Sequence, residues 1–209
     1  MDKTPYIRFS AKDLCTRSCM QLKMFRERPE LKPKPNVAQW QGCDFQHNLT
    51  KALDNVIGEE MGGCLQHNNL LIYFANDIVT TGHIFEVKNI TNYDATKDEW
   101  FLKSSLAQCA VYKTLTHFCK NKLKTAAFHV QNGNKYTECV VGDYTHYILV
   151  FGTKRFEIVV HNYDAIRNFI LAKATHSLNW DSAKAFDLKY KGQEFEILKQ
   201  YFSFKEIES

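Results

Sequence analysis

Near the start of the chain, capping residues and apolar residues at helical spacing predict two helices. A helix is predicted over residues 10–28, because Ser10 suits the N-cap, Asp13 lies in the first turn and Pro29 ends the run. A second helix is predicted over residues 44–57, where apolar side chains recur at Phe45, Leu49, Leu53 and Val56. The glycines that follow are expected to close it: Gly58, Gly62 and Gly63.

The next stretch predicts a β-hairpin. Residues 70–80 and 83–90 are apolar and rich in strand-forming side chains, and Thr81-Gly82 between them suits a tight turn. With that turn as the centre, Thr80 faces His83, Val79 faces Ile84 and Asp77 faces Glu86. The hairpin therefore brings Asp77 and Glu86, nine positions apart, onto neighbouring strands.

The second half mixes helices and strands. Thr96 and Glu99 form a capping-box pattern that opens a predicted helix to about residue 120. Strands are predicted over residues 125–130, 144–151 and 155–161, and helices over 163–174 and 194–201. This order favours an α/β fold with a central mixed β-sheet flanked by helices. We expect one domain over residues 1–209, with a core at about 9–176 and a C-terminal extension at 177–209.

Composition narrows the class of protein. The chain has 209 residues, 44% hydrophobic and 24% charged, which is typical of a globular domain and excludes a disordered one. The net charge of +4 permits a nucleic-acid partner without demanding one. The seven cysteines are an odd number without a CxxC pair, and no run resembles a signal peptide or a membrane span. We expect a soluble intracellular protein with no membrane partner. It would be cytoplasmic in a bacterium, and otherwise in the cytoplasm, nucleus or an organelle.

The hairpin also gathers charged residues. Asp77 and Glu86 face each other with Cβ atoms about 4.5–5.5 Å apart, and Lys88 points to the same side as Glu86. The other side carries Ile78, Phe85 and Val87 at its apolar positions and is expected to face the core. Opposed carboxylates repel each other, and Mg²⁺ would compensate because it binds one or two protein carboxylates. The alternative is an ordinary charged cluster on a solvated strand.

Further residues occur in a characteristic order around this cluster. His47 precedes it on a predicted helix, Glu86-Val87-Lys88 forms an acidic-x-lysine motif, and Gln108 and Tyr112 follow four apart on the next helix. In this order the chain resembles the PD-(D/E)XK nuclease superfamily, most closely its RecB-type exonuclease domains and the CRISPR-adaptation exonucleases. Residues 9–19 look like the first helix of that family, and the resemblance covers about residues 9–118.

The resemblance implies a restriction-endonuclease-like core and a Mg²⁺- or Mn²⁺-dependent deoxyribonuclease. Such an enzyme hydrolyses DNA phosphodiester bonds, here in an exonuclease-like way, in repair, recombination or defence. It further implies metal ligands at His47, Asp77, Glu86 and the carbonyl of Val87, with Lys88 as the catalytic lysine.

The same resemblance gives Gln108 and Tyr112 a role in positioning the lysine or the DNA backbone. Taken singly, a histidine such as His47 is more often a packed or surface residue than a ligand, and a pair such as Gln108 and Tyr112 is more often a polar helix edge. The prediction depends on their joint occurrence. Glu59, Glu60 and His83 could approach the site and are not assigned to it.

An iron–sulfur cluster is not expected. Some relatives carry four cysteines, one early and three near the C-terminus, to bind such a cluster. Here Cys139 is the last cysteine, and Cys15 and Cys19 lie one helical turn apart on a predicted helix face. The sequence therefore predicts no cluster.

DNA, single- or double-stranded, is the expected partner. The candidates for phosphate contact are five lysines, whose alternative is a solvated surface: Lys32, Lys34, Lys120, Lys122 and Lys124. The chain has no phosphate-binding loop of the P-loop kind, so movement along DNA would need a protein partner such as a helicase. The alternative function is a catalytically inactive DNA-binding or scaffolding subunit. A third interpretation, a globular protein with accidental motifs, predicts no divalent-metal binding.

Overall fold

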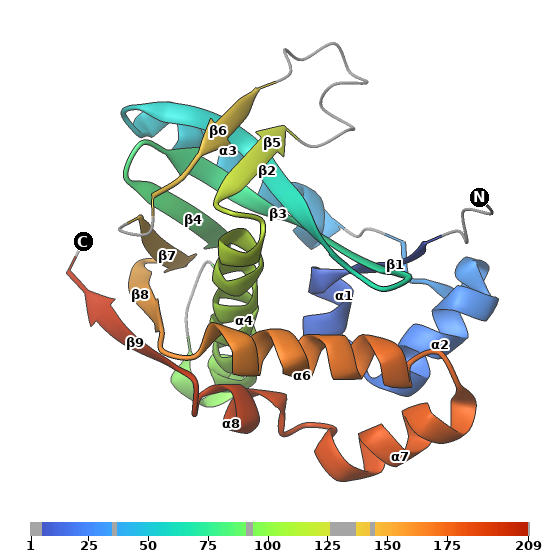
Figure 1. Cartoon of the computed structure of the whole chain (residues 1–209). Coiled ribbons are helices and arrows are strands. Elements are labelled where there is room, and N and C mark those ends of the chain that lie inside the picture. The colour runs from blue at the N-terminus through green and yellow to red at the C-terminus, as the bar shows by residue number, and fades with distance from the viewer. Residues whose placement is uncertain (1–5, 35–36, 91–93, 126–136, 143–144, 209) are drawn as a thin grey trace.

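The computed structural model of the chain describes residues 6–34, 37–90, 94–125, 137–142 and 145–208. In this part of the chain, nine strands form one mixed sheet flanked by helices (Figure 1). The elements follow one another as β1 (Ile7–Ser10), α1 (Ala11–Thr16), α2 (Cys19–Glu27), the 3₁₀ helix η1 (Pro29–Leu31), α3 (Val37–Ala52), β2 (Val56–His67), β3 (Leu70–Thr80), β4 (His83–Lys88), α4 (Ala95–Phe118), β5 (Lys122–Thr125), β6 (Glu138–Val140), β7 (His146–Phe151), β8 (Lys154–Val160), α6 (Tyr163–His176), α7 (Trp180–Tyr190), α8 (Glu194–Leu198) and β9 (Phe202–Ile207). The predicted α/β class with a mixed sheet is confirmed.

The order of strands in the sheet is β6-β5-β2-β3-β4-β7-β8-β9, and β1 pairs with the beginning of β3. The β1–β3 and β4–β7 pairs are parallel, and the other pairs are antiparallel. Strands β3 and β4 therefore lie in the middle of the sheet, with paired neighbours on both sides. Residues on them are held by several hydrogen-bonded ladders at once, which is a rigid setting for a functional group.

The predicted hairpin is confirmed as β3 and β4. Val79 pairs with Ile84 as expected, and the hydroxyl of Thr80 accepts a hydrogen bond of 3.0 Å from the backbone N–H of His83. The predicted core side of β4 is wrong, however: Phe85 is only half-buried, while Glu86 is buried. The reason is that α4 packs over the side that carries Glu86.

Two predicted helices have different limits in the structure. The first is divided into α1 and α2, because Ser18 caps a new helix in a capping box with Gln21. The predicted cap at Ser10 is confirmed, since its hydroxyl accepts from the N–H of Asp13. The next helix, α3, begins earlier than predicted and ends at Ala52.

The glycines expected to close that helix lie inside β2 instead. Gly62 pairs with Ala75 on β3 and with Lys124 on β5, so β2 is held from both sides. A Cβ atom at Gly62 would lie 1.8 Å from the carbonyl oxygen of Phe74. Glycine is required here by the close approach of two strands and not by a helix end.

The helix that carries Gln108 begins with a different cap from the one predicted. Asp94, not Thr96, is the N-cap of α4: its carboxylate accepts from the N–H of Thr96 at 2.9 Å. The carboxylate of Asp98 in turn accepts from the N–H of Asp94 at 2.8 Å. An aspartate two residues earlier therefore replaces the predicted threonine cap, and the helix itself is confirmed.

The C-terminal half departs most from the prediction. The strand predicted over 125–130 is β5, which ends at Thr125, and residues 126–130 lie outside the described part of the chain, as does Tyr144. The helix over 163–174 is confirmed as α6, and that over 194–201 is shorter, as α8. Strands β6 and β9 and helix α7 were not predicted. Strand β9 exists because it pairs along all of its length with β8.

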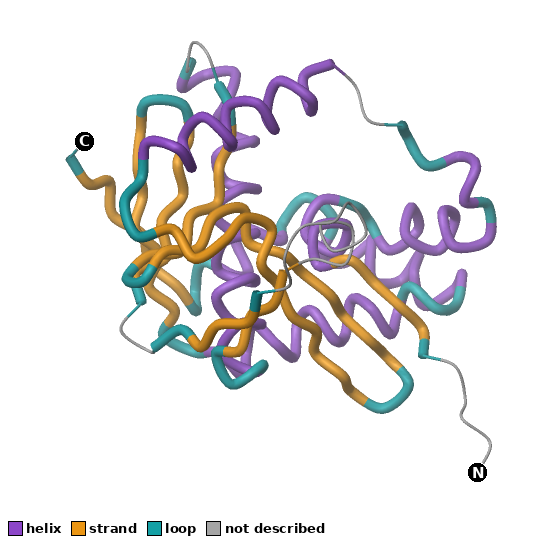
Figure 2. The backbone as a smooth tube through the Cα atoms, turned by 90° about the horizontal axis from the view of Figure 1, so that it is seen from above, coloured by secondary structure: helices purple, strands orange, loops and turns teal. Residues whose placement is uncertain are grey.

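Helix α4 is the centre of the core. It contacts α1, α6, α8 and strands β2, β3, β7 and β8. Figure 1 shows α4 in front of the sheet, with α6 lying across it, while α3 lies behind β2 and β3. Figure 2, seen from above, shows the strands between these helices. All seven cysteines are free thiols, and no helix among the described residues is both long and apolar enough to cross a membrane.

Candidate active site

Three neighbouring strands bring three carboxylates into one row. The register of β2 with β3 places Glu60 beside Asp77, because Glu59 pairs with Ile78 and Met61 with Asn76. The register of β3 with β4, continued by one residue, places Asp77 beside Glu86. The sheet therefore assembles Glu60, Asp77 and Glu86 near its centre.

Glu86 is the hydrogen-bonding centre of the site. Its Oε1 accepts from Lys88 Nζ at 2.7 Å and from Gln108 Nε2 at 2.7 Å. The residue is only 2% exposed, and the side chain of Lys88 is 14% exposed. Glu86 Oε2 is buried and has no hydrogen-bond partner among the described residues. A buried carboxylate oxygen without a donor is costly, so a bound ligand at this oxygen would be favourable.

Asp77 and Lys88 complete the charged cluster. Asp77 Oδ2 accepts from the backbone N–H of Val87 at 2.6 Å. Burial, and then the charge of Glu86, raise the pKa of Asp77 well above its usual value. Burial alone would lower the pKa of Lys88, but the charges of Glu86 and Asp77 outweigh it and raise that pKa. The lysine is therefore held in its protonated form by the two carboxylates.

Gln108 and Tyr112 support this cluster from α4. Tyr112 is 4% exposed, and its hydroxyl shares a hydrogen bond with Gln108. Its ring also packs against Phe74 of β3, with ring centroids 5.7 Å apart. One helical turn separates Gln108 from Tyr112, so both face the sheet and the pair fixes the orientation of Glu86.

His47 lies apart from these residues. Its Nδ1 is 3.3 Å from Oε1 of Glu59, and its side chain is 58% exposed. Among the described residues, no three or more histidine, cysteine, aspartate or glutamate side chains are grouped so that they could hold a metal ion. The structure thus brings Asp77, Glu86, Lys88, Gln108 and Tyr112 together, but it does not bring His47 to them.

Two residues that the sequence did not assign contact this cluster. Gln46, next to His47 on α3, donates from Nε2 to the backbone carbonyl of Asp77 at 2.9 Å and to Oε1 of Glu60 at 3.4 Å. Glu60 has a φ of 49°, which is rare for a residue with a side chain. Burial, and then the charge of Glu86, raise its pKa, although the bond from Gln46 opposes this. The signal in the sequence was slight: a glutamine beside the candidate histidine and a carboxylate between two glycine positions.

The donor atoms suit a hard divalent cation. They are carboxylate oxygens, and one of them, Glu86 Oε2, has no partner within the described ranges. The positive charge of a bound cation would also lower the raised pKa of Asp77. Mg²⁺ needs only one or two protein carboxylates, because water and substrate phosphate fill its remaining positions. The absence of a three-ligand group among the described residues therefore does not conflict with such an ion.

The candidate DNA-contact lysines are dispersed. Lys32 forms an ion pair of 2.7 Å with Asp13, and Lys124 forms one of 3.1 Å with Glu138. Lys34 and Lys122 are exposed, and Lys120 follows α4 with a φ of 56°. Lys122 and Lys124 thus share β5, just after Lys120, whereas Lys32 and Lys34 follow η1.

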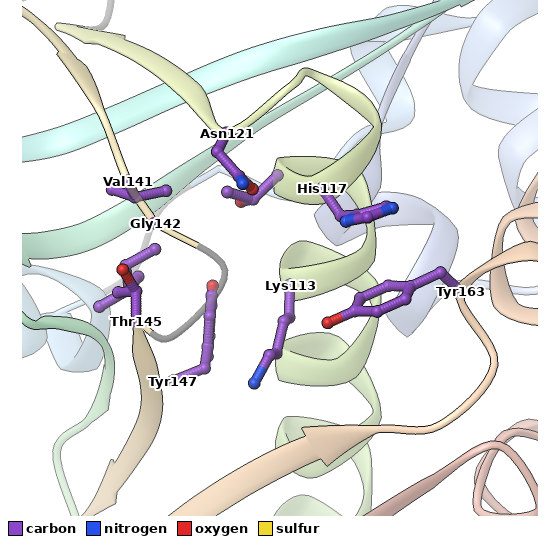
Figure 3. A pocket seen from close by; sticks show the side chains of 10 residues that line it. Lys113, His117, Asn121, Val141, Gly142, Thr145, Tyr147 and Tyr163 are labelled. Carbon is purple, nitrogen blue, oxygen red and sulfur yellow. The ribbon is translucent and has the colours of Figure 1, made fainter.

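A small cavity lies between α4, the beginning of β7 and the segment that follows β6. Figure 3 shows the side chains around it: Lys113 and His117 from α4, Thr145 just before β7, Tyr147 on β7 and Tyr163 at the start of α6. Its volume is about 20 Å³, enough for one water molecule. The hydroxyls of Thr116 and Thr145 line it and have no partner among the described residues. The cavity is too small for a substrate.

The chain was compared with protein-family models, with curated proteins and with solved structures, and no match was found in any of the three comparisons.

Proposed function

We propose that the chain is a metal-dependent nuclease with a restriction-endonuclease-like core of RecB type, which hydrolyses DNA phosphodiester bonds. One observation carries this proposal: Glu86 is buried in the middle of the sheet and is held by both Lys88 and Gln108 at 2.7 Å. Glu86 and Gln108 are 22 positions apart and belong to separate motifs. The nuclease resemblance requires these two motifs to act together. A charged cluster on a solvated strand would not bury its glutamate to 2% exposure.

The metal would be Mg²⁺ or Mn²⁺, held by Asp77, Glu86 and the carbonyl of Val87. Such an ion polarises a phosphate group and lowers the pKa of a bound water molecule. Glu86 retains Oε2 for this purpose, since Oε1 is used by Lys88 and Gln108. We leave His47 out of the ligand set, because it is exposed and faces Glu59.

The protein groups around the ion would have separate tasks. Lys88 remains protonated between two carboxylates, so it offers a positive charge and N–H donors to the charge that develops on the phosphate. It is a poor general base in this setting. Gln108 and Tyr112 are positioning residues, because they act through Glu86. Gln46 holds the backbone of Asp77 and orients Glu60 as a further carboxylate beside the site.

The direct test is cleavage of end-labelled single-stranded and double-stranded linear DNA and of closed circular DNA, with Mg²⁺, Mn²⁺ or EDTA. We expect cleavage of linear DNA that EDTA abolishes, and protection of circular DNA if the enzyme acts from ends. A matching RNA substrate tests the choice of DNA. If the protein binds DNA and cleaves none of these substrates with either metal, the proposal is wrong and the inactive scaffolding function takes its place.

Metal binding has a second expected consequence, which does not depend on cleavage. At free Mn²⁺ of 100 times its dissociation constant, binding stabilises the folded protein by about 2.7 kcal/mol, or roughly 5–11 °C in melting temperature for a chain of this size. Asp77→Asn should lose this response. It removes a carboxylate charge while it keeps an oxygen that can accept from Val87.

The same variant makes a pH prediction in EDTA. Folding raises the pKa of Asp77 above its value in the unfolded chain. The contribution of Asp77 to stability is therefore fully present below the pKa of the unfolded state, and it is lost as the pH rises through the pKa of the folded state. Asp77→Asn should therefore melt above the wild type at neutral pH, and the difference should shrink at acidic pH. The exposed Asp54→Asn is the control in both melting experiments. A Mn²⁺ response that survives in Asp77→Asn would remove Asp77 from the ligand set.

A further inference from the structure

A second polar cavity lies where β1, α1 and α2 meet. Its volume is about 140 Å³, several times the room that one water molecule needs. Charged side chains from β1, α1, α2, the connection between the two helices and the loop after η1 surround it. The apolar side chains of Phe9, Leu22 and Phe25 also line it. The residues that give it its chemical character are Arg8, Arg17, Arg26, Lys32, Asp13 and Tyr73.

The charge around this cavity is strongly positive. Four cationic side chains and one carboxylate line it, which gives a net charge of +3. Asp13 is shared, since it binds Arg17 Nε at 2.9 Å and Lys32 Nζ at 2.7 Å. Neither Arg8 nor Arg26 has an ion pair or a hydrogen bond from its side chain within the described part of the chain. Four cations against one carboxylate leave an excess of positive charge at the cavity, so an anionic ligand would stabilise them.

Two of the guanidinium groups are held in place by aromatic rings. The Cζ atom of Arg17 lies 4.8 Å from the centroid of Phe25, and that of Arg26 lies 5.4 Å from the centroid of Phe9. Arg17 uses Nε for Asp13, so its two terminal nitrogens are not needed for that bond. A planar guanidinium fixed in this way matches two oxygens of a phosphate at once, and binding costs little side-chain entropy.

We propose that this cavity binds a phosphate group of a polynucleotide strand. Tyr73, 47% exposed at the rim, offers a ring on which a base can stack. Tyr73 and Asp77 are four residues apart on β3, or about 13 Å, which is about four nucleotides of a B-form strand. A strand anchored in the cavity can therefore reach the carboxylates. This path rests on the proposed nuclease function, whereas phosphate binding in the cavity does not.

The test is the affinity of a 3′-fluorescein-labelled single-stranded oligonucleotide, measured by anisotropy in EDTA so that no strand is cut. The double variant Arg8→Ala/Arg26→Ala should bind about tenfold more weakly per arginine removed. The slope of log affinity against log salt should fall by about 0.7 for each phosphate that the protein no longer binds. Arg155→Ala, an exposed arginine on β8, is the matched control and should bind as the wild type does. The variants Arg8→Lys and Arg26→Lys keep the charge and should recover part of the affinity.

Paired oligonucleotides with a 5′-phosphate or a 5′-hydroxyl identify which phosphate is bound. A preference for the 5′-phosphate that disappears in the double variant indicates a terminal phosphate. Equal binding that the double variant weakens for both indicates a backbone phosphate, and either result supports the proposal. Wild-type affinity in the double variant, with an unchanged melting temperature, overturns it. So does equally effective competition by polyglutamate of the same charge, because the cavity would then bind acidic peptide without selecting phosphate.

The two proposals can fail separately. Weaker binding in the double variant, together with no cleavage under any metal, would remove the nuclease function and leave the phosphate site. Metal-dependent cleavage that requires Lys88, together with full affinity in the double variant, would support the nuclease function and remove the phosphate site.

Discussion

Replacing Lys88 with alanine is expected to slow metal-dependent DNA cleavage by about 10²- to 10³-fold, the usual effect of removing one donor to the charge that develops in a transition state. Lys88 Nζ lies 2.7 Å from Glu86 Oε1 and is held protonated by two carboxylates. In the proposed function it stabilises the negative charge that develops in the transition state. The measurement is the single-turnover rate on linear DNA at saturating Mg²⁺ and at saturating Mn²⁺.

This experiment needs a control for folding, because the alanine removes the ammonium partner of a carboxylate that is 2% exposed. Breaking a buried ion pair from one side costs about 3–5 kcal/mol of stability. Lys88→Gln keeps a donor for Glu86 and should fold well while it remains slow. Lys97→Ala removes a lysine that is 82% exposed on α4 and should keep the wild-type rate.

A comparison with Glu86→Gln separates the lysine from the metal. Lys88→Gln should retain the rise in melting temperature with Mn²⁺, whereas Glu86→Gln should lose both that rise and cleavage. If Lys88→Gln cleaves DNA as fast as the wild type, Lys88 has no part in the reaction.

Gly62→Ala is expected to lower the free energy of unfolding by about 3 kcal/mol or more. The new Cβ atom would lie 1.8 Å from the carbonyl oxygen of Phe74 and 2.8 Å from the Cα atom of Ala75. Both are backbone atoms of the neighbouring strand, so no side chain can turn away to make room. The strands would have to separate beside the row of carboxylates.

The effect can be measured as the urea midpoint of unfolding, with the slope of free energy against urea unchanged. Gly42→Ala is the matched control, because nothing lies within 4 Å of its Cβ position on α3. That change should be neutral, or stabilising by up to about 1 kcal/mol, since alanine favours helix more than glycine does. An unaltered midpoint for Gly62→Ala would mean that β2 does not pair with β3 in this register.

The central hairpin was predictable because its signals are local. Two runs of strand-forming side chains and a turn at Thr81-Gly82 are read within about twenty residues, and together they predict the register that pairs Val79 with Ile84. The same register, continued to the next residues, brings Asp77 beside Glu86. The i, i+4 relation of Gln108 and Tyr112 follows likewise from helical geometry alone. The division of the first helix was also readable, since Ser18 and Gln21 form a capping-box pattern that the prediction overlooked.

The assignment of β2 depended on its pairing with two other strands, of which β5 is distant in the sequence. Its glycines are compatible with a helix end or with a closely packed strand, and only the presence of β3 and β5 on its two sides decides between them. Strand β9 is similar, because its edge pairing with β8 joins residues more than forty positions apart. The strand propensity of a segment carries little information about which distant strand it pairs with.

The amino-acid sequence by itself determined the elements that local periodicity and turns define, and with them the pairing of Asp77 and Glu86 beside Lys88. Only the tertiary structure decided which side chains of α3 reach this cluster. Adjacent residues on a helix point roughly 100° apart, so the packing of α3 turns Gln46 towards Asp77 and leaves His47 with Glu59. The structure also decided that the side of β4 with Glu86 is the buried one, because α4 covers it and Gln108 donates to its carboxylate. The rotation of a helix about its own axis is fixed by contacts with other elements, and a pattern within one segment does not contain them.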